Sequence, residues 1–396
     1  MYPSKTIKLL EQLTQSLELP ESAYDKAVKR YEDLGAWFDR EGSKLQYNKP
    51  HIFPQGSFRL GTAIKPINEA ESYDLDLACN VRKGVSTSTH SQQQLKDIVG
   101  EEIEAYRIAR QIQAKKEEKH RCWRLEYADG VNFHMDIVPC IPESDKNVVR
   151  LTESMHKHGL NREVASNLSS FAVCITDNSN HNYSNISDDW QISNPEGYAK
   201  WFELRMTTHS LREAYATKAQ IDDIPLFKRK APLQKIIQLL KRHRDMMFAS
   251  APDSKPISVI ITTLAASAYS GTSSLEDALN EVINALVSFA NSNSDVVLNP
   301  VNPEENFADK WIHPEYSKLN LKKNFSLWAY EVQRHFNEIT SADNVQRVVE
   351  VARDRFAVNT NANEWATNLG LLIAPNIIST PSKNIERVEA KPWTRV

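Results

Sequence analysis

The sequence predicts two lobes, an α/β lobe followed by an all-α lobe. The chain has 396 residues, and a single hydrophobic core stops growing at about 250–300 residues, so a second core is expected. Short alternating runs, typical of strands, occur in the first half, whereas nearly every segment from Pro195 onward has a helical period. We place the boundary near Asn194, between a lobe of residues 1–194, which includes N-terminal bridging helices, and a helical lobe of residues 195–378.

The elements of the first lobe follow from the spacing of apolar residues and from turn residues. Pro20 ends one helical run, and Asp129 with Gly130 forms a hairpin turn. In chain order we expect a helix over residues 4–18, a helix over 21–41, a strand over 51–55, a strand over 73–81, a helix over 91–119 and a hairpin over 121–139.

The second half of the chain is predicted to be helical. Residues 143–195 are rich in Asn, Ser and Asp and are expected to form surface loop, with one strand at the apolar run SSFAVCI. Residues 379–396 carry scattered Pro and charge, which indicates a mobile tail. The expected helices cover residues 197–206, 232–248, 257–269, 274–290, 326–336 and 344–357.

The composition is that of an ordinary globular protein. Charged residues make up 25% and apolar residues 41% of the chain, and no stretch approaches the roughly 18 apolar residues of a membrane helix. The first residues lack the pattern of a signal peptide, so we expect a cytoplasmic protein with no membrane partner. The net charge of −3 gives no general attraction for nucleic acid. Four cysteines without a C-x-x-C motif are expected to be reduced thiols: Cys79, Cys122, Cys140 and Cys174.

The chemistry of the sequence is concentrated between Pro54 and Leu77 and at one later position. Gly56 and Ser57 form a compact turn that can present backbone N–H groups and a hydroxyl to an anion. Asp74 and Asp76 lie two positions apart on a strand, so their side chains point to the same face, and Asp136 lies on a later strand. Neighbouring carboxylates repel one another unless a cation neutralises them, and Mg²⁺ prefers oxygen ligands.

Two interpretations of these residues are open. A Gly-Ser turn alone is common, and three aspartates could merely cap turns or pair with basic residues. The combination of a Gly-Ser turn, a D-x-D strand and a third aspartate on a later strand is typical of polymerase-β-type nucleotidyltransferases. In these enzymes two metal ions contact the attacking and leaving oxygens of an in-line displacement.

Longer segments carry a more specific resemblance. PQGSFRLGTAIKP, YDLDLACNV, HMDIVP and LLKRHRD are similar to the bacterial cGAS/DncV-like nucleotidyltransferases, the CD-NTase family of oligonucleotide cyclases in antiphage CBASS signalling. The resemblance spans about residues 50–270. It implies a polymerase-β-like core, a C-terminal helical lobe of the OAS/cGAS type and a nucleotide cleft between them. It also implies condensation of NTPs, ATP among them, into a cyclic di- or trinucleotide.

The resemblance assigns roles to individual residues. Asp74, Asp76 and Asp136 would bind two Mg²⁺ ions, or Mn²⁺ in their place. The nucleotide phosphates and cleft would be contacted by Gln55, Gly56, Ser57, Arg124, Lys241 and Ser258. Each of the last three has an alternative: Arg124 could be an exposed strand charge, Lys235 could replace Lys241, and Ser258 could be a helix cap.

Several further interpretations are left open by the sequence. One of the aromatic residues Trp190, Tyr198, Trp201 and Phe202 could stack on a base, although packing between the lobes is favoured. His134 is expected to support the site rather than bind metal, because Mg²⁺ prefers oxygen. The expected partners are NTPs, an effector reached through the nucleotide product, and a regulatory protein. Alternative functions are nucleotide addition to RNA or protein, and nucleotide binding without turnover.

Overall fold

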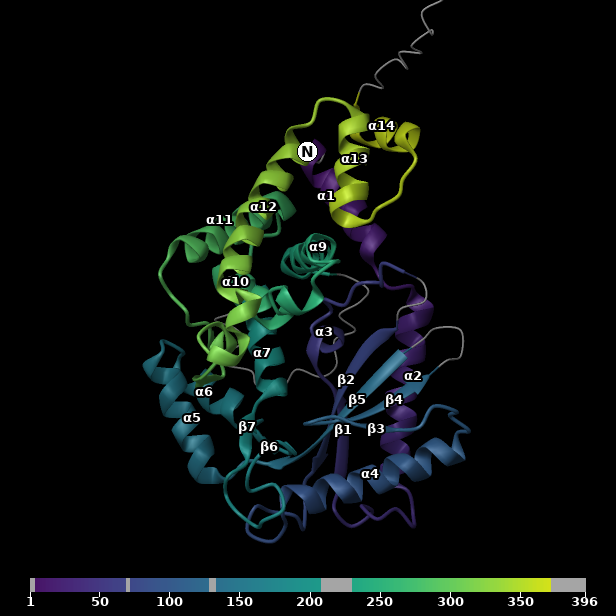
Figure 1. Cartoon of the computed structure of the whole chain (residues 1–396), viewed down its shortest axis with the longest axis vertical. Coiled ribbons are helices and arrows are strands. Elements are labelled where there is room, and N and C mark those ends of the chain that lie inside the picture. Colours follow the sequence, from purple (N-terminus) through teal and green to yellow (C-terminus); the bar gives the residue numbers. More distant parts are fainter. Residues whose placement is uncertain (1–3, 69–71, 128–132, 208–229, 372–396) are drawn as a thin grey trace, which may run out of the picture.

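The computed structural model describes residues 4–68, 72–127, 133–207 and 230–371. Figure 1 shows a lower lobe built around a mixed β-sheet and an upper lobe of helices, with α9 (Pro232–Met247) at the centre of the upper lobe. The predicted turn at Asp129 and Gly130 and the predicted tail from residue 379 lie outside the described residues.

The sheet of the lower lobe has the strand order β1-β2-β5-β4-β3, and β6 and β7 extend it from β5. The central pair β2 and β5 is parallel, whereas the other pairs are antiparallel. The strands are β1 (Pro50–Pro54), β2 (Tyr73–Val81), β3 (Glu117–Glu118), β4 (Trp123–Tyr127), β5 (Phe133–Pro142), β6 (Val173–Ile175) and β7 (Gln191–Ser193).

One face of this sheet is covered by α2 (Glu21–Asp39) and α4 (Gln92–Ala109). The capping box of Ser91 and Gln94 begins α4, with the Ser91 hydroxyl accepting a hydrogen bond from the Gln94 backbone N–H. Leu75 and Met135 point from the sheet into this core and are fully buried. Because side chains alternate along a strand, the polar residues between these apolar ones point to the opposite face, toward the helical lobe.

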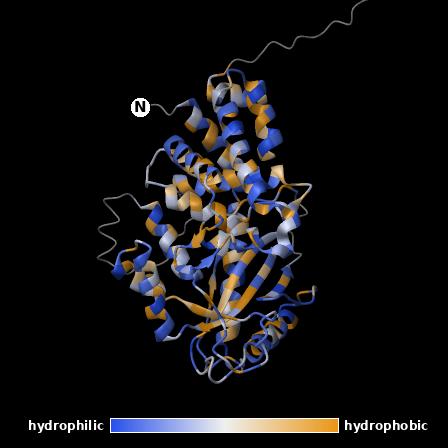
Figure 2. Cartoon of the chain, turned by 60° about the vertical axis from the view of Figure 1, so that its left-hand side comes forward, coloured by the Kyte–Doolittle hydropathy of each residue, from blue (hydrophilic) through white to orange (hydrophobic). Residues whose placement is uncertain are grey.

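The upper lobe has its own hydrophobic core, in which α9 is surrounded by other helices. Its helices are α7 (Pro195–Met206), α9, α10 (Ser258–Ala268), α11 (Leu275–Asn291), α12 (Leu321–Ser341), α13 (Val345–Phe356) and α14 (Ala362–Leu369). Figure 2 shows hydrophobic stripes along these helices and along the central strands. The first helix, α1 (Lys5–Leu17), packs into this core through Leu9, Leu10, Leu13 and Leu17.

The structure corrects several expectations for the connecting segments. Residues 143–195 were expected to be loop with one strand, but they contain α5 (Asp145–Lys157) and α6 (Arg162–Ser169). The helix expected over residues 91–119 ends at Ala109. A small hairpin of β8 (Leu298–Asn299) and β9 (Asn302–Asn306), as well as α14, was not predicted.

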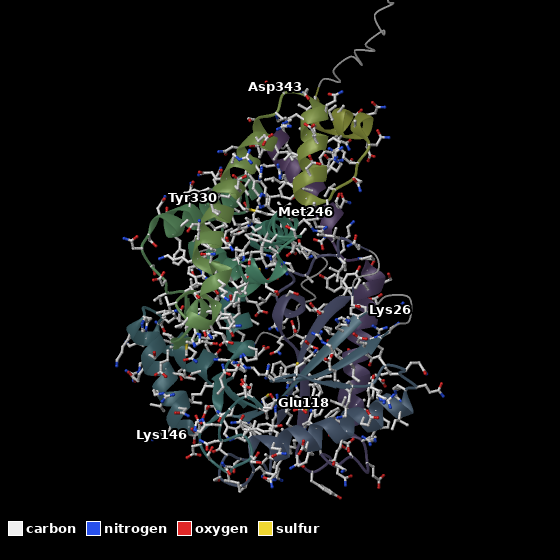
Figure 3. The ribbon with its side chains drawn as sticks, viewed as in Figure 1. Lys26, Glu118, Lys146, Met246, Tyr330 and Asp343 are labelled. Atoms are coloured by element: carbon white, nitrogen blue, oxygen red, sulfur yellow. The ribbon has the colours of Figure 1, made fainter. Side chains whose placement is uncertain are left out.

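The lobe boundary near Asn194 stays a prediction. Asn194 caps α7, since its side chain accepts a hydrogen bond from the Gly197 backbone N–H at 2.9 Å. However, α1, α5 and α6 contribute buried residues to the same core as α9, so the hydrophobic cores do not divide at one position of the chain. Figure 3 labels Lys146 on α5 and Lys26 on α2, which lie on opposite flanks of the lower lobe.

The four cysteines carry no disulfide, as expected from their spacing, and three of them are buried. Within the described parts of the chain, none of the helices combines the length and the apolar character that crossing a bilayer requires.

Candidate active site

Three carboxylates lie on the face of the sheet that points to the helical lobe. The parallel register of β2 and β5 sets Asp76 directly beside Asp136, and Asp74 beside His134. Asp74 and Asp76 share a face because they are two positions apart on one strand. The sequence therefore predicted the common face correctly, and the strand pairing brings together residues that are 60 positions apart.

The electrostatics of Asp76 reflect this crowding. Burial and, to a smaller extent, the negative charges of Asp74 and Asp136 raise its pKa to about 7, although Lys241 and Arg124 partly oppose the shift. The ionised form of Asp76 is therefore unfavourable near neutral pH. A bound cation would relieve this repulsion.

Asp136 is already paired with a cation in this structure. Arg124 lies directly opposite Asp136 on β4 and donates two hydrogen bonds to it, from Nε to Oδ1 and from Nη2 to Oδ2, both 2.7 Å long. These hydrogen bonds raise the pKa of Arg124 above its usual range. Arg124 is thus not a free surface charge, but it contacts a carboxylate rather than the cleft.

The turn at Gly56 is packed against Asp76. The Gln55 backbone N–H donates to the Asp76 carbonyl oxygen at 2.8 Å, which fixes the turn on β2. Gly56 has a φ of +61°, and a Cβ atom there would lie 2.4 Å from Asp76 Oδ2. Glycine is therefore required both by the backbone conformation and by the space available. It begins the short helix α3 (Gly56–Arg59).

Helix α9 holds the segment that follows this turn. Its polar side chains donate hydrogen bonds to backbone carbonyls in residues 60–65: Gln234 to Leu60, Gln238 to Ala63, Lys241 to Thr62 and Arg242 to Lys65. The sequence analysis did not identify the two glutamines as part of the site. Their spacing of four residues, which sets them on one side of the helix together with Lys241, is the signal that could have found them.

Lys241 lines the cleft, as predicted, whereas Lys235 does not. Lys241 Nζ lies 2.9 Å from the Thr62 carbonyl oxygen, and burial together with the charge of Arg244 lowers its pKa to about 7. Lys235 instead forms an ion pair with Glu11 on α1, with 2.5 Å between Nζ and Oε2. The alternative in which Lys235 reaches the cleft is therefore not supported by the structure.

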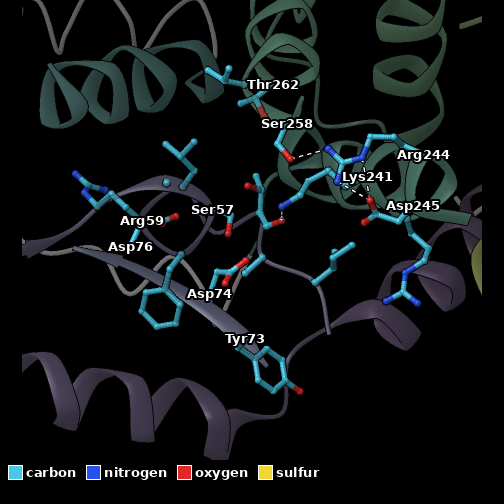
Figure 4. A pocket seen from close by; sticks show the side chains of 18 of the residues that line it. Ser57, Arg59, Tyr73, Asp74, Asp76, Lys241, Arg244, Asp245, Ser258 and Thr262 are labelled. Carbon is cyan, nitrogen blue, oxygen red and sulfur yellow. Dashed lines mark hydrogen bonds and ion pairs between the residues drawn. The ribbon is translucent and has the colours of Figure 1, made fainter. Parts of the chain in front are cut away.

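Ser258 lies beside Lys241 at the start of α10 (Figure 4). Its Oγ accepts a hydrogen bond of 2.7 Å from Arg244 Nη1, and the same guanidinium donates to Asp245. The cap position of α10 is Ile257, so the interpretation of Ser258 as a helix cap is wrong. This network explains why Arg244 lies on the apolar side of α9.

A cavity of about 860 Å³ separates the carboxylate face from the helical lobe, a volume within the range of small-molecule sites. Residues predicted for the site that line it are Gly56, Ser57, Asp74, Asp76, Lys241 and Ser258. Gln55, Arg124 and Asp136 are not among its lining residues, and the Gln55 side chain donates to the Leu77 carbonyl at 3.4 Å. Figure 3 labels Met246, another lining residue, on α9 in the upper lobe.

Of the four aromatic residues near the predicted boundary, only Tyr198 lines this cavity, and all four are at least nine-tenths buried. Packing is therefore their main role. His134 lies between two carboxylates, with Nε2 at 3.0 Å from Glu126 Oε1 and Nδ1 at 3.7 Å from Asp74 Oδ1. This position agrees with a supporting role for His134.

Arg59 is a further residue that the sequence analysis missed. It lies on α3, and it forms ion pairs with Glu196 at 3.1 Å and Glu203 at 2.6 Å on α7. Arg59 thereby joins the turn segment to the helical lobe. An arginine in a turn has no sequence signal that identifies such distant partners.

The donor set fits a divalent metal ion by its chemistry. Asp74, Asp76 and Asp136 supply hard oxygen ligands on one face, and burial together with the neighbouring carboxylates raises the pKa of Asp76. In the described parts of the chain, no group of three His, Cys, Asp or Glu side chains already converges in a metal-binding arrangement. Asp136 would have to exchange Arg124 for a metal ion.

Comparison with known proteins identifies related families and folds. Residues 50–139 match the nucleotidyltransferase domain of the family described as cyclic GMP-AMP synthase DncV-like. The chain is 27% identical over 358 residues to a c-di-GMP synthase from Roseivirga ehrenbergii, which covers 88% of this chain and 83% of the relative. It is 24% identical to the cyclic dinucleotide synthase CdnG of Bradyrhizobium diazoefficiens, over 76% of this chain and 69% of that protein.

Solved structures share the fold. The structure of the Bradyrhizobium diazoefficiens CD-NTase CdnG in complex with GTP has a TM-score of 0.63 at 21% identity, covering 92% of this chain and 98% of that one. The complex of Escherichia coli MS115-1 CdnC with a HORMA protein has a TM-score of 0.57 at 14% identity, covering 89% and 98% of the two chains.

Proposed function

The chain belongs to the DncV-like nucleotidyltransferases of the CD-NTase family, and from this premise we propose that it condenses NTPs into a cyclic di- or trinucleotide. The observation that carries the proposal is the register of β2 and β5. It sets Asp76 beside Asp136, two positions from Asp74, next to the turn at Gly56. This arrangement supports in-line transfer of a nucleotidyl group.

The residues of the site would have different roles in this reaction. Mg²⁺ ions, with Mn²⁺ as an alternative, would be held by Asp74, Asp76 and Asp136, and would offset the negative charge that develops on the phosphate oxygens. Ser57 and Lys241 both line the cavity, where they would contact the triphosphate of the donor nucleotide. Positioning and charge neutralisation supply most of the rate in this type of chemistry.

Each phosphodiester bond would be formed by the same displacement reaction. The 3′- or 2′-hydroxyl oxygen of one ribose attacks the α-phosphorus of a second nucleotide, the bond from that phosphorus to the bridging oxygen breaks, and pyrophosphate leaves. Asp136, once it is released from Arg124, can accept the hydroxyl proton. The linear product then turns in the cavity, and a second exchange closes the ring. Ser258, held by Arg244, would contact phosphate during these steps.

The product would act as a second messenger in antiphage CBASS signalling, in the cytoplasm, where it would reach a downstream effector. The named relatives are a c-di-GMP synthase and a cyclic dinucleotide synthase, and a solved neighbour is bound to GTP. We therefore propose GTP as well as ATP as a substrate. The HORMA complex of the neighbour CdnC supports a regulatory protein as a further partner.

The test is incubation of the purified chain with all four labelled NTPs and Mg²⁺, followed by measurement of pyrophosphate and mass spectrometry of the products. Wild type should form a cyclic oligonucleotide, and the Asp74→Ala/Asp76→Ala variant should form none. A product that appears only when RNA or a protein acceptor is added would instead indicate nucleotide addition to a polymer. Nucleotide binding without pyrophosphate release, identical in both proteins, would overturn the proposal.

A further inference from the structure

One wall of the cavity carries a carboxylate that the reaction at Asp74 and Asp76 does not use. This wall is formed by Asn299, Glu305 and Phe307, from the β8–β9 hairpin and the residue that follows it, together with Tyr198 of α7. Of these four, the sequence analysis considered only Tyr198, as one of the aromatic residues that could stack on a base, and the hairpin itself was not predicted.

Glu305 is held in a fixed orientation. Asn299 Nδ2 donates a hydrogen bond of 2.7 Å to Glu305 Oε2, and Asn299 Oδ1 accepts a hydrogen bond of 3.0 Å from the Val301 backbone N–H. Asn299 is only 5% exposed, so its amide group cannot turn without breaking both hydrogen bonds. Within the described residues no hydrogen-bond donor contacts Glu305 Oε1, so this oxygen is available to a ligand in the cavity.

The surroundings of Glu305 indicate which part of a nucleotide it would contact. A carboxylate repels phosphate, and the cavity offers cationic and hydroxyl groups for phosphate elsewhere, at Lys241 and Ser57. Two positions after Glu305, Phe307 packs edge-on against Tyr198 with ring centroids 6.2 Å apart. An aromatic surface beside a hydrogen-bonding group suits a base, because bases pack on aromatic rings and are read along their edges.

We propose that Glu305 selects guanine, an inference that rests on the proposed function. Guanine has two adjacent donors on its Watson–Crick edge, N1–H and the N2 amino group, and a carboxylate can accept from both, since its two oxygens offer about four acceptor sites. Adenine and cytosine each place an acceptor nitrogen beside a single amino group, and the N–H of uracil lies between two carbonyl oxygens. Among these bases, guanine alone can donate two hydrogen bonds to the carboxylate without placing an acceptor atom next to a carboxylate oxygen.

The electrostatic state of the carboxylate agrees with this role. Burial raises the pKa of Glu305, whereas the hydrogen bond from Asn299 opposes the rise. A partly desolvated carboxylate gains more from N–H donors than an exposed one does, because water competes less well for it. A base that leaves it unpaired is therefore disfavoured, and sites of this kind can discriminate strongly.

The experiment compares the use of GTP and ATP by wild type and by Glu305→Gln. The glutamine can still accept from Asn299, but its amide N–H₂ would oppose the donors of guanine and match the N1 acceptor of adenine. We expect the ratio of kcat/KM for GTP over ATP to fall at least tenfold, and the adenine content of the products, measured by mass spectrometry, to rise. Glu304→Gln is the matched control, because Glu304 is exposed and points to Arg150 at 3.4 Å; its ratio should stay unchanged.

A measurement of nucleotide binding distinguishes failure of this inference from failure of the proposed function. If no NTP mixture yields pyrophosphate, the shift in melting temperature caused by GTP or by ATP still reports base preference, and Glu305→Gln should reduce the GTP effect alone. The inference is overturned if Glu305→Gln keeps the wild-type ratio of GTP to ATP in both turnover and binding. It is also overturned if the substitution weakens both nucleotides equally.

Discussion

Replacing Asp76 by asparagine should make the protein more stable while it abolishes turnover. Asp76 lies beside Asp136 and two positions from Asp74, and its pKa rises from 3.8 to about 7 in the folded protein. A shift of about three units corresponds to about 4 kcal/mol at 1.36 kcal/mol per unit. Because Asp76 is half-buried and lines a cavity, we expect about half of this, or about 2 kcal/mol, to appear as a gain in stability.

The sign of the pH dependence follows from the direction of the shift. In the unfolded chain Asp76 ionises near pH 3.8, whereas in the folded protein it ionises near pH 7. Between these values the folded state binds more protons, so the wild type loses stability as the pH rises from about 4 to about 7. The asparagine variant has no such loss. Its advantage should therefore grow over this range and be constant above pH 7.

Thermal unfolding without divalent ions measures this effect. At pH 8 the Asp76→Asn variant should melt about 3–5 °C above wild type, and at pH 5 the difference should be smaller. Added Mg²⁺ should raise the melting temperature of wild type more than that of the variant. Asp74→Asn is the matched control, because the Asp74 side chain is 68% exposed and should respond less. If Asp76→Asn melts at or below the wild-type temperature at pH 8, the repulsion argument is wrong.

Three further substitutions test the surrounding geometry. Gly56→Ala should lower the free energy of unfolding in urea by at least about 1–2 kcal/mol and remove most pyrophosphate release. The reason is that φ is +61° and the new Cβ would lie 2.4 Å from Asp76 Oδ2. Normal activity of this variant would contradict the packing described for Gly56. Lys241→Met should raise the KM for NTP at least tenfold, whereas Lys235→Met should leave it unchanged, because of these two lysines only Lys241 lines the cavity. Equal effects of the two substitutions would refute the assignment of Lys241 to the cavity. Arg124→Gln should strengthen Mn²⁺ binding in calorimetry by freeing Asp136, and weaker binding would show that Arg124 supports the metal site.

The local part of the site could be predicted from the sequence, because strand alternation is a property of a few residues. Y-D-L-D-L and F-H-M-D-I each place aspartate on the face opposite the apolar residues, and Leu75 and Met135 are indeed fully buried. The helical period likewise places Lys241 at the edge of the apolar stripe of α9, which is formed by Leu233, Ile236, Ile237 and Leu240. Its partner, the carbonyl of Thr62, lies 179 positions away and leaves no trace in the local pattern.

The helices α5 and α6 could not be predicted in the same way. Their packing depends on very few apolar residues, mainly Leu151 and Met155 on α5 and Ala165 and Leu168 on α6. Within a segment rich in Asn and Ser, four such residues give no clear period. Ser144 and Asn161 do cap these helices, and these caps were the available signal.

The pairing of Arg124 with Asp136 shows how much depends on a single residue of strand register. A two-residue turn at Asp129 and Gly130, as the sequence suggests, would set Arg124 opposite Met135 and point it away from the carboxylates. The observed register sets Trp123 opposite Ile137 and Arg124 opposite Asp136, one position further along. The register of β4 and β5 therefore decides whether Asp136 lies opposite an arginine or opposite an apolar residue.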